Sequence, residues 1–111
     1  MPALAYDLHI EQGSEYHLRI PVLGEDDLPL LMAGWGVRGV IRAHPGSPYV
    51  LYDLDNALSL GQSWVDLTIL GDTSALWEWR QGVYDVELID LGGSPFRLLQ
   101  GRVHVSPEVT H

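Results

Sequence analysis

Apolar and polar residues alternate along most of this chain, which is the pattern of half-buried β-strands. In residues 82–90 the apolar side chains of Tyr84, Val86 and Leu88 are separated by acidic ones. A Gly-Gly turn follows, and a second alternating run extends over residues 95–105. These two runs predict a long antiparallel hairpin.

The same period predicts further strands, separated by short turns. A first hairpin is expected to join residues 6–11 to residues 16–20 through the turn at 12–14, and the other strands are expected at 35–43, 49–53, 57–60 and 64–70. Turns that recur every 8–12 residues or so are typical of a two-sheet sandwich. We therefore expect an all-β fold, an immunoglobulin-like antiparallel sandwich of about seven or eight strands, in one domain over residues 1–111.

One segment, residues 72–80, has a helical rather than a strand pattern. Leu76 and Trp79 are three residues apart and fall on one side of a helix, and Asp72 is a suitable N-cap. We expect one or two helical turns here, leading into the strand that begins at Gly82. The sequence from Gly82 to Tyr84 resembles the corner of immunoglobulin-like sandwiches, where a tyrosine hydroxyl bonds back to the upstream backbone.

Composition narrows the chemistry that the chain can perform. It carries a net charge of −9, all six of its basic residues are arginines, and it has no cysteine. Disulfides, thiolate metal sites and lysine-based catalysis are therefore excluded. The acidic balance argues against nucleic acid as a partner, and no stretch is long enough to cross a membrane or to act as a signal peptide. We expect a soluble protein that is made in the cytoplasm.

Three patterns could be read as binding motifs. Residues 34–39 match G-x-G-x-x-G, but strand-like residues follow where a dinucleotide site needs a helix, so we expect glycines at a strand bend. Asp53, Asp55 and Asn56 lack the spacing of a calcium loop and are expected to form turns. His9 and His17 are expected to face each other on the first hairpin, with His104 on the last strand.

We interpret these three histidines as ordinary surface residues, because they are scattered along the sequence without the spacing of a zinc site. No nucleophile or acid–base pattern stands out either. We therefore expect no catalytic, cofactor-binding or metal site, and no enzymatic activity.

The candidate functional residues are instead those that could anchor a protein–protein interface. The connector before Gly82 contains two tryptophans that flank Glu78, so both cannot easily face the same interior. Core packing is the commoner fate of each, and one of them is a candidate interface anchor, because tryptophan is enriched where binding energy concentrates. A second apolar patch lies within residues 21–32, and the segment 106–111 is a third candidate. Arg80, Arg97 and Arg102 are expected to pair with acidic neighbours across such contacts. The interface residues that we predict are Trp77, Trp79, Arg80, Leu28, Leu30, Leu31, Pro107 and Val109.

The C-terminal part of the chain contains YDVEL at residues 84–88, RLLQGRV at 97–103 and VSPEVT at 105–110. Nearer the start are IEQGSEYHL at 10–18, DLPL at 27–30 and GDTSAL at 71–76. In these motifs, most of the chain resembles small structural proteins of tailed bacteriophages. In that group the C-terminal motif closes an immunoglobulin-like sandwich. The resemblance implies a virion component without catalytic residues.

The predicted function is therefore assembly. We expect a tail- or baseplate-region subunit of a virion that contacts copies of itself and other virion proteins in a symmetric arrangement. It would be made and assembled in the cytoplasm of the bacterial host. Two alternatives remain open, a capsid decoration protein on the head exterior and a carbohydrate- or host-receptor-binding module.

Overall fold

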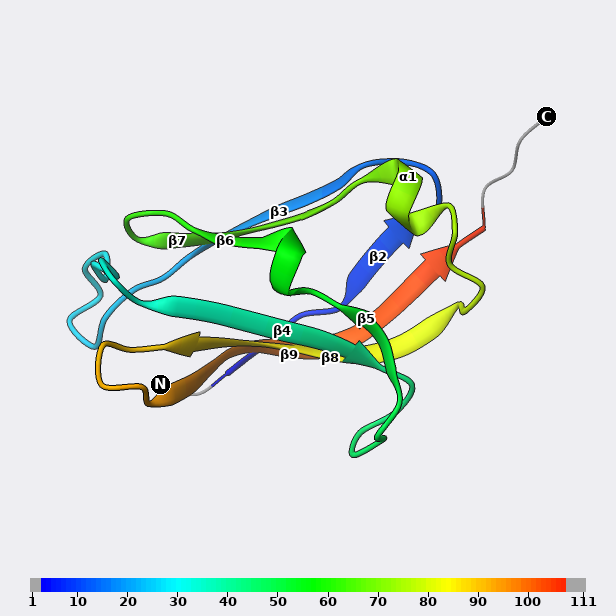
Figure 1. Ribbon diagram of the computed structural model, residues 1–111. Coiled ribbons are helices and arrows are strands. Elements are labelled where there is room, and N and C mark those ends of the chain that lie inside the picture. Colours follow the sequence, from blue (N-terminus) through cyan, green and yellow to red (C-terminus); the bar gives the residue numbers. More distant parts are fainter. Residues whose placement is uncertain (1–2, 108–111) are drawn as a thin grey trace.

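The computed structural model describes residues 3–107 and consists mainly of β-strands arranged in two layers (Figure 1). A 3₁₀-helix, η1 (Asp55–Ala57), and a single helical turn, α1 (Gly71–Ser74), interrupt the strands. The strands are β1 (Leu4–Ala5), β2 (Leu8–Glu11), β3 (Tyr16–Pro21), β4 (Gly36–Arg42), β5 (Val50–Asp53), β6 (Leu58–Leu60), β7 (Trp64–Ile69), β8 (Gln81–Ile89) and β9 (Pro95–Ser106).

The strand order confirms the predicted sandwich. One sheet has the order β1-β9-β8-β4-β5, with β2 also pairing to β9, and the other has the order β3-β7-β6. In the larger sheet β5 lies beyond β4, and the three-stranded sheet packs on this sheet. This arrangement is immunoglobulin-like. The predicted strands at 35–43, 49–53, 57–60 and 64–70 correspond to β4, β5, β6 and β7, with ends that differ by one residue.

The core lies between the sheets and is filled by alternate residues of the strands that face it. In β7 and β8 every second side chain is buried, as the period-2 pattern predicts. Burying one such aliphatic side chain contributes about 1.5–3 kcal/mol. The fully buried aliphatic residues include Leu8, Ile10, Val22, Ile41, Leu54, Val65, Leu67, Val86 and Val103.

The predicted hairpin between β8 and β9 is present. The two strands are antiparallel neighbours over nearly their whole length, from Gln81 opposite His104 to Ile89 opposite Pro95. At the turn, the amide of Gly93 donates to the Asp90 carbonyl at 3.0 Å, and Gly93 has a φ of 84°. Glycine adopts this left-handed conformation without steric cost, which suits it to the turn.

The predicted first hairpin is wrong. β2 pairs with β9 in parallel, whereas β3 pairs with β7 in the other sheet. The intervening turn crosses between the sheets and is bound to the α1 segment. The side chain of Gln12 donates to the Trp77 carbonyl at 2.7 Å, and the amide of Gly13 donates to Ser74 Oγ at 3.0 Å. These contacts direct the chain away from a hairpin.

The edge strand formed by β1 and β2 has a break opposite Gly101. Both strands keep the same register on β9, with Leu4 opposite Leu99 and Leu8 opposite Val103. Between them the Tyr6 amide still donates to the Gln100 carbonyl at 2.9 Å. In a regular parallel ladder the amide of Arg102 would donate to the carbonyl of Tyr6. Here Asp7 Oδ1 accepts that amide, at 2.9 Å.

The carbonyl of Tyr6 is thereby turned out of the ladder, and it accepts a hydrogen bond from the hydroxyl of Tyr84 at 2.5 Å. Gly101 makes this possible, because a Cβ at that position would lie 2.2 Å from the Tyr6 oxygen. Tyr84 is buried, and its burial raises the pKa of the phenol above its ordinary value. The bond differs from the expected corner, in which the tyrosine binds backbone only a few residues upstream.

The helical segment also departs from the prediction. The N-cap of α1 is Leu70, and neither its side chain nor that of Asp72 caps the helix. The turn ends at Ser74, which is buried and whose hydroxyl donates to the Gly71 carbonyl at 3.3 Å. Leu76 consequently lies beyond the helix and is 82% exposed. The three-residue spacing from Leu76 to Trp79 therefore does not place the two on one buried side.

Candidate functional site

An exposed apolar surface lies at one end of the sandwich. The loop of residues 22–35 between β3 and β4 and the turn of residues 90–94 between β8 and β9 both occur there (Figure 1). Leu28, Leu31 and Leu91 are 61%, 68% and 76% exposed. We call this the loop-end surface, and it comprises Leu23, Leu28, Leu31, Leu91 and Phe96. Two of the predicted interface residues, Leu28 and Leu31, belong to it.

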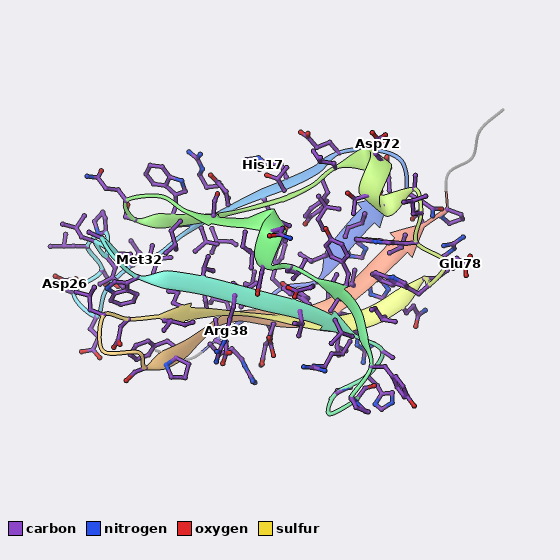
Figure 2. The ribbon with its side chains drawn as sticks, viewed as in Figure 1. His17, Asp26, Met32, Arg38, Asp72 and Glu78 are labelled. Carbon is purple, nitrogen blue, oxygen red and sulfur yellow. The ribbon has the colours of Figure 1, made fainter. Side chains whose placement is uncertain are left out.

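The shape of the loop follows from a tight turn at its tip. The amide of Gly24 donates to the Leu28 carbonyl at 2.9 Å, and the amide of Asp27 donates to the Gly24 carbonyl at 3.0 Å. Asp26 Oδ1 accepts the Leu28 amide at 3.1 Å, a common role for aspartate in turns. Asp27 has a φ of 61°, which aspartate tolerates better than most residues. The turn presents Glu25, Asp26 and Asp27 to solvent beside Leu28 (Figure 2).

A small pocket lies beneath this loop. It has a volume of about 160 Å³, and its walls include Leu30, Trp35, Leu88 and Phe96. The rings of Trp35 and Phe96 are stacked with centroids 6.2 Å apart. Leu30, a predicted interface residue, is half-buried and forms one wall. Leu30 therefore lines the pocket beneath the loop and is not part of the exposed loop-end surface.

Of the two fates considered for Trp77, core packing is the one observed. Its side chain is 8% exposed and belongs to the core. Its ring centroid lies 5.1 Å from that of Tyr52 and 4.6 Å from that of Trp79. Two hydrogen bonds turn the chain inward after α1. The amide of Trp77 donates to the Ser74 carbonyl, and the carbonyl of Trp77 accepts from the side chain of Gln12. Trp77 therefore closes the core at this end.

The neighbouring predicted residues lie closer to the surface. Trp79 is half-buried, and its Nε1 is a buried donor without a hydrogen-bond partner among residues 3–107. Arg80 is exposed and donates to the Trp79 carbonyl at 3.2 Å. Pro107 is exposed, and Val109 lies outside the described residues. Leu76, which the helical pattern placed on one side with Trp79, is an exposed apolar residue that the sequence reasoning missed here.

A second feature is the outward face of the larger sheet, which carries Arg38, Arg42, Arg97 and Arg102 (Figure 2 labels Arg38). A hollow of about 430 Å³ opens on this face. We call it the arginine hollow, and it is lined by three arginines and one aspartate, together with smaller apolar and polar groups: Ala5, Val40, Arg42, Pro45, Gly46, Val83, Tyr84, Asp85, Arg97, Gln100, Gly101 and Arg102.

The positions of these arginines follow from strand register. Arg42 lies opposite Val83, and Val83 lies opposite Arg102, so the three form a row across β4, β8 and β9. Arg42 donates to the Ser47 carbonyl at 3.0 Å, which fixes its guanidinium at the edge of the hollow. Arg97 lies 3.7 Å from Asp85. Arg42 comes from β4, whereas Arg97 and Arg102 come from β9, so the proximity of Arg42 to the other two could not be read from the sequence.

The histidines do not converge. His9 and His104 are register partners on β2 and β9, and their rings stack with centroids 5.1 Å apart. His17 lies on β3 in the other sheet, 3.4 Å from Asp66, so the prediction that it faces His9 is wrong. Arg19 also donates to Asp66, at 2.8 Å, and lowers the pKa of that carboxyl. Residues 3–107 contain no group of three or more potential metal ligands.

The two other motifs take the forms that we expected. Gly34 has a φ of 80° in the loop, and the extended strand β4 follows it where a dinucleotide site would have a helix. The amide of Asp55 donates to Asp53 Oδ1 at 2.9 Å, which is an Asx-type turn. Within the described part of the chain, no helix has the length and apolarity needed to span a membrane.

Comparison with known proteins agrees with the fold. No protein-family model and no curated protein matches the chain. Among solved structures, it is similar to a chain named Tim-1, with a TM-score of 0.51 and 14% sequence identity. The alignment covers 99% of each chain. At this level of identity the similarity concerns the immunoglobulin-like sandwich alone.

Proposed function

We propose that this protein is a structural subunit of a bacteriophage particle, located in the tail or baseplate region, and that it acts through protein–protein contacts. The phage assignment rests on the sequence motifs in residues 10–18, 84–88 and 97–110. It would be made and assembled in the cytoplasm of the host. A rigid sandwich that presents loops at its ends suits such a role, because loops on a rigid scaffold commonly carry binding residues.

The observation that carries the proposed mode of action is the loop-end surface. Leu28, Leu31 and Leu91 are each more than 60% exposed and come from two loops that meet at one end of the sandwich. Clustered exposed apolar side chains rimmed by polar residues are typical of protein-interaction sites. Glu25, Asp26 and Asp27 provide such a rim. A contact with an apolar centre and a polar edge is the usual anatomy of an interface.

A capsid decoration protein on the head exterior would use the same kind of contact, and locating the chain in the particle separates the two. The carbohydrate-binding alternative receives less support. It relied on stacking a sugar ring on Trp77 or Trp79, and Trp77 is buried while Trp79 is half-buried. A sugar would have to stack on another aromatic residue, such as the exposed Tyr49.

Replacing Leu28 and Leu31 together by serine should prevent incorporation of the chain into phage particles. Hot-spot residues contribute about 2 kcal/mol or more each, so the double change should weaken the contact by well over tenfold. The measurement is the amount of tagged chain in purified particles, with electron microscopy to locate it. Because both side chains are exposed, we expect the free energy of unfolding to change little.

The matched control is Leu76→Ser, which removes an exposed leucine at the opposite end of the sandwich. It should be incorporated like the wild type. Equal incorporation of the Leu28→Ser/Leu31→Ser variant would show that the loop-end surface is not the contact. Absence of the wild-type chain from purified particles would contradict the virion role itself.

A further inference from the structure

The charges of this molecule are unevenly placed. Its net charge is −9, yet the arginine hollow is lined by Arg42, Arg97 and Arg102 against one acidic residue, Asp85. This makes the hollow a local positive site with an excess of two charges, three minus one. The loop of residues 22–35 is the opposite case, because it contains three carboxylates and no arginine, lysine or histidine.

The two surfaces also match in their apolar parts. Val83 is half-buried and lies between Arg42 and Arg102 across the sheet. Val40 is also half-buried and lines the hollow opposite Asp85, the carboxylate that pairs with Arg97. On the loop, Leu28 follows directly after the three carboxylates and is 61% exposed. An apolar side chain flanked by acids can therefore contact an apolar floor flanked by guanidinium groups. Charge complementarity around an apolar centre gives a contact both specificity and register.

We propose that the loop-end surface of one copy binds the arginine hollow of a second copy. This proposal rests on the assembly role given above and specifies its geometry. Guanidinium groups of Arg97 and Arg102 would bind carboxylates of Glu25 and Asp27, and Leu28 would pack on Val40 and Val83. Arg97 and Arg102 are exposed, so neither needs to leave a buried site to form the contact.

A second copy is a better occupant than the loop of the same molecule. The loop ends where β4 begins, whereas Arg42 is the last residue of β4 and lies in register with Val83 and Arg102. The length of β4 therefore separates the loop from Arg42 and Arg102 (Figure 1), and of the three arginines of the hollow only Arg97, which follows Phe96, lies near the loop-end surface. A symmetric contact between two loop ends is disfavoured because it would bring two groups of three carboxylates together.

The contact joins two different surfaces and is therefore heterologous. Such contacts repeat from copy to copy and produce closed rings or helical filaments, depending on the rotation between neighbours. Each copy in the series would use both surfaces, and only an open end would leave one of them free. This is the type of contact that circular or tubular parts of a particle require.

The test uses two variants of the full chain and analytical ultracentrifugation. The hollow variant carries Arg97→Glu and Arg102→Glu, and the loop variant carries Glu25→Gln and Asp27→Asn, so that the two altered surfaces do not attract each other. The wild type should self-associate, and its association should weaken as salt is added, because salt screens exposed charges. Each variant alone should lose at least tenfold in association constant. Glu78→Arg, which reverses an exposed charge at the end of the sandwich opposite the loop (Figure 2), is the matched control and should behave like the wild type.

An equimolar mixture of the two variants gives the decisive result. The hollow variant retains an intact loop, and the loop variant retains an intact hollow, so the mixture should form a one-to-one complex that does not grow. A wild type that stays monomeric up to roughly 1 mM, variants that self-associate like the wild type, or a mixture of folded variants that stays monomeric would each overturn the proposal. Circular dichroism and urea unfolding confirm that each variant is folded.

These outcomes are separable from the virion role. If the wild type is monomeric but the Leu28→Ser/Leu31→Ser change still prevents incorporation into particles, the proposed function stands and the copy-to-copy contact falls. If the copies associate as described but the chain is absent from particles, the copy-to-copy contact stands and the virion role falls.

Discussion

Replacing Gly101 by alanine should lower the free energy of unfolding by about 3 kcal/mol, the upper part of the range for overpacked positions. The added Cβ would lie 2.2 Å from the Tyr6 oxygen and 2.8 Å from its carbonyl carbon. Both atoms belong to the backbone, so the strand itself must move. That movement also removes the bond from the Tyr84 hydroxyl to the same oxygen.

Urea unfolding measures the loss, and amide hydrogen exchange locates it. Exchange should increase most in β1 and β2, because those strands are held on β9 around Gly101. Gly92→Ala is the matched control, since a Cβ there would meet only Asp90 Oδ1 at 3.5 Å. The control should change stability by less than about 0.5 kcal/mol. Equal losses in the two variants would contradict the account of the strand break.

Replacing Tyr84 by phenylalanine should cost about 1–3 kcal/mol, although it removes a single oxygen atom. The change leaves the carbonyl of Tyr6 without its hydrogen bond, and an acceptor that is partly buried regains only part of its hydration energy. The ring itself remains packed in the core. Tyr49→Phe is the control, because that tyrosine is exposed, and its loss should stay below about 0.5 kcal/mol. Thermal and urea unfolding of both variants provide the comparison.

Stability should also fall as the pH rises above about 10. Burial raises the pKa of Tyr84 in the folded protein, and burial raises that of Tyr16 as well. In the unfolded chain these phenols ionise at their ordinary value, so above it the unfolded state has released protons that the native state still holds. The contribution of these two phenols to stability is therefore constant below this pH and decreases above it. The Tyr84→Phe variant should show a shallower decrease, and parallel curves would contradict the assignment.

The sequence pattern predicted the strands better than their pairing. Alternation of apolar and polar residues shows which face of a strand is buried, and this placed β4 to β9 within one residue or nearly so. It carries no information on which strand lies alongside. The turn at residues 12–14 had the composition of a hairpin turn, yet the hydrogen bonds of Gln12 and Gly13 to the α1 segment direct it across the sandwich.

The candidate surfaces were predictable only in part. Leu28 and Leu31 belong to the apolar patch predicted within residues 21–32, and both are exposed. Trp77 was a candidate on the same kind of reasoning, but it packs in the core. The arginine hollow depends on the register of β4, β8 and β9. Register is a property of the assembled sheet, so no local sequence motif predicts it.

The parallel pairing of the N-terminal edge strand with β9 has a consequence for the order of folding. Asp7 and Arg102, which form one of the contacts that hold this edge, are separated by 95 positions in the sequence. During synthesis β1 and β2 stay unpaired until β9, the strand with which both pair, has left the ribosome. Contacts of such long range slow the folding of β-proteins, because a large loop must close before they form. We therefore expect this strand to dock late in folding. A nascent chain that ends before β9 cannot form the contact.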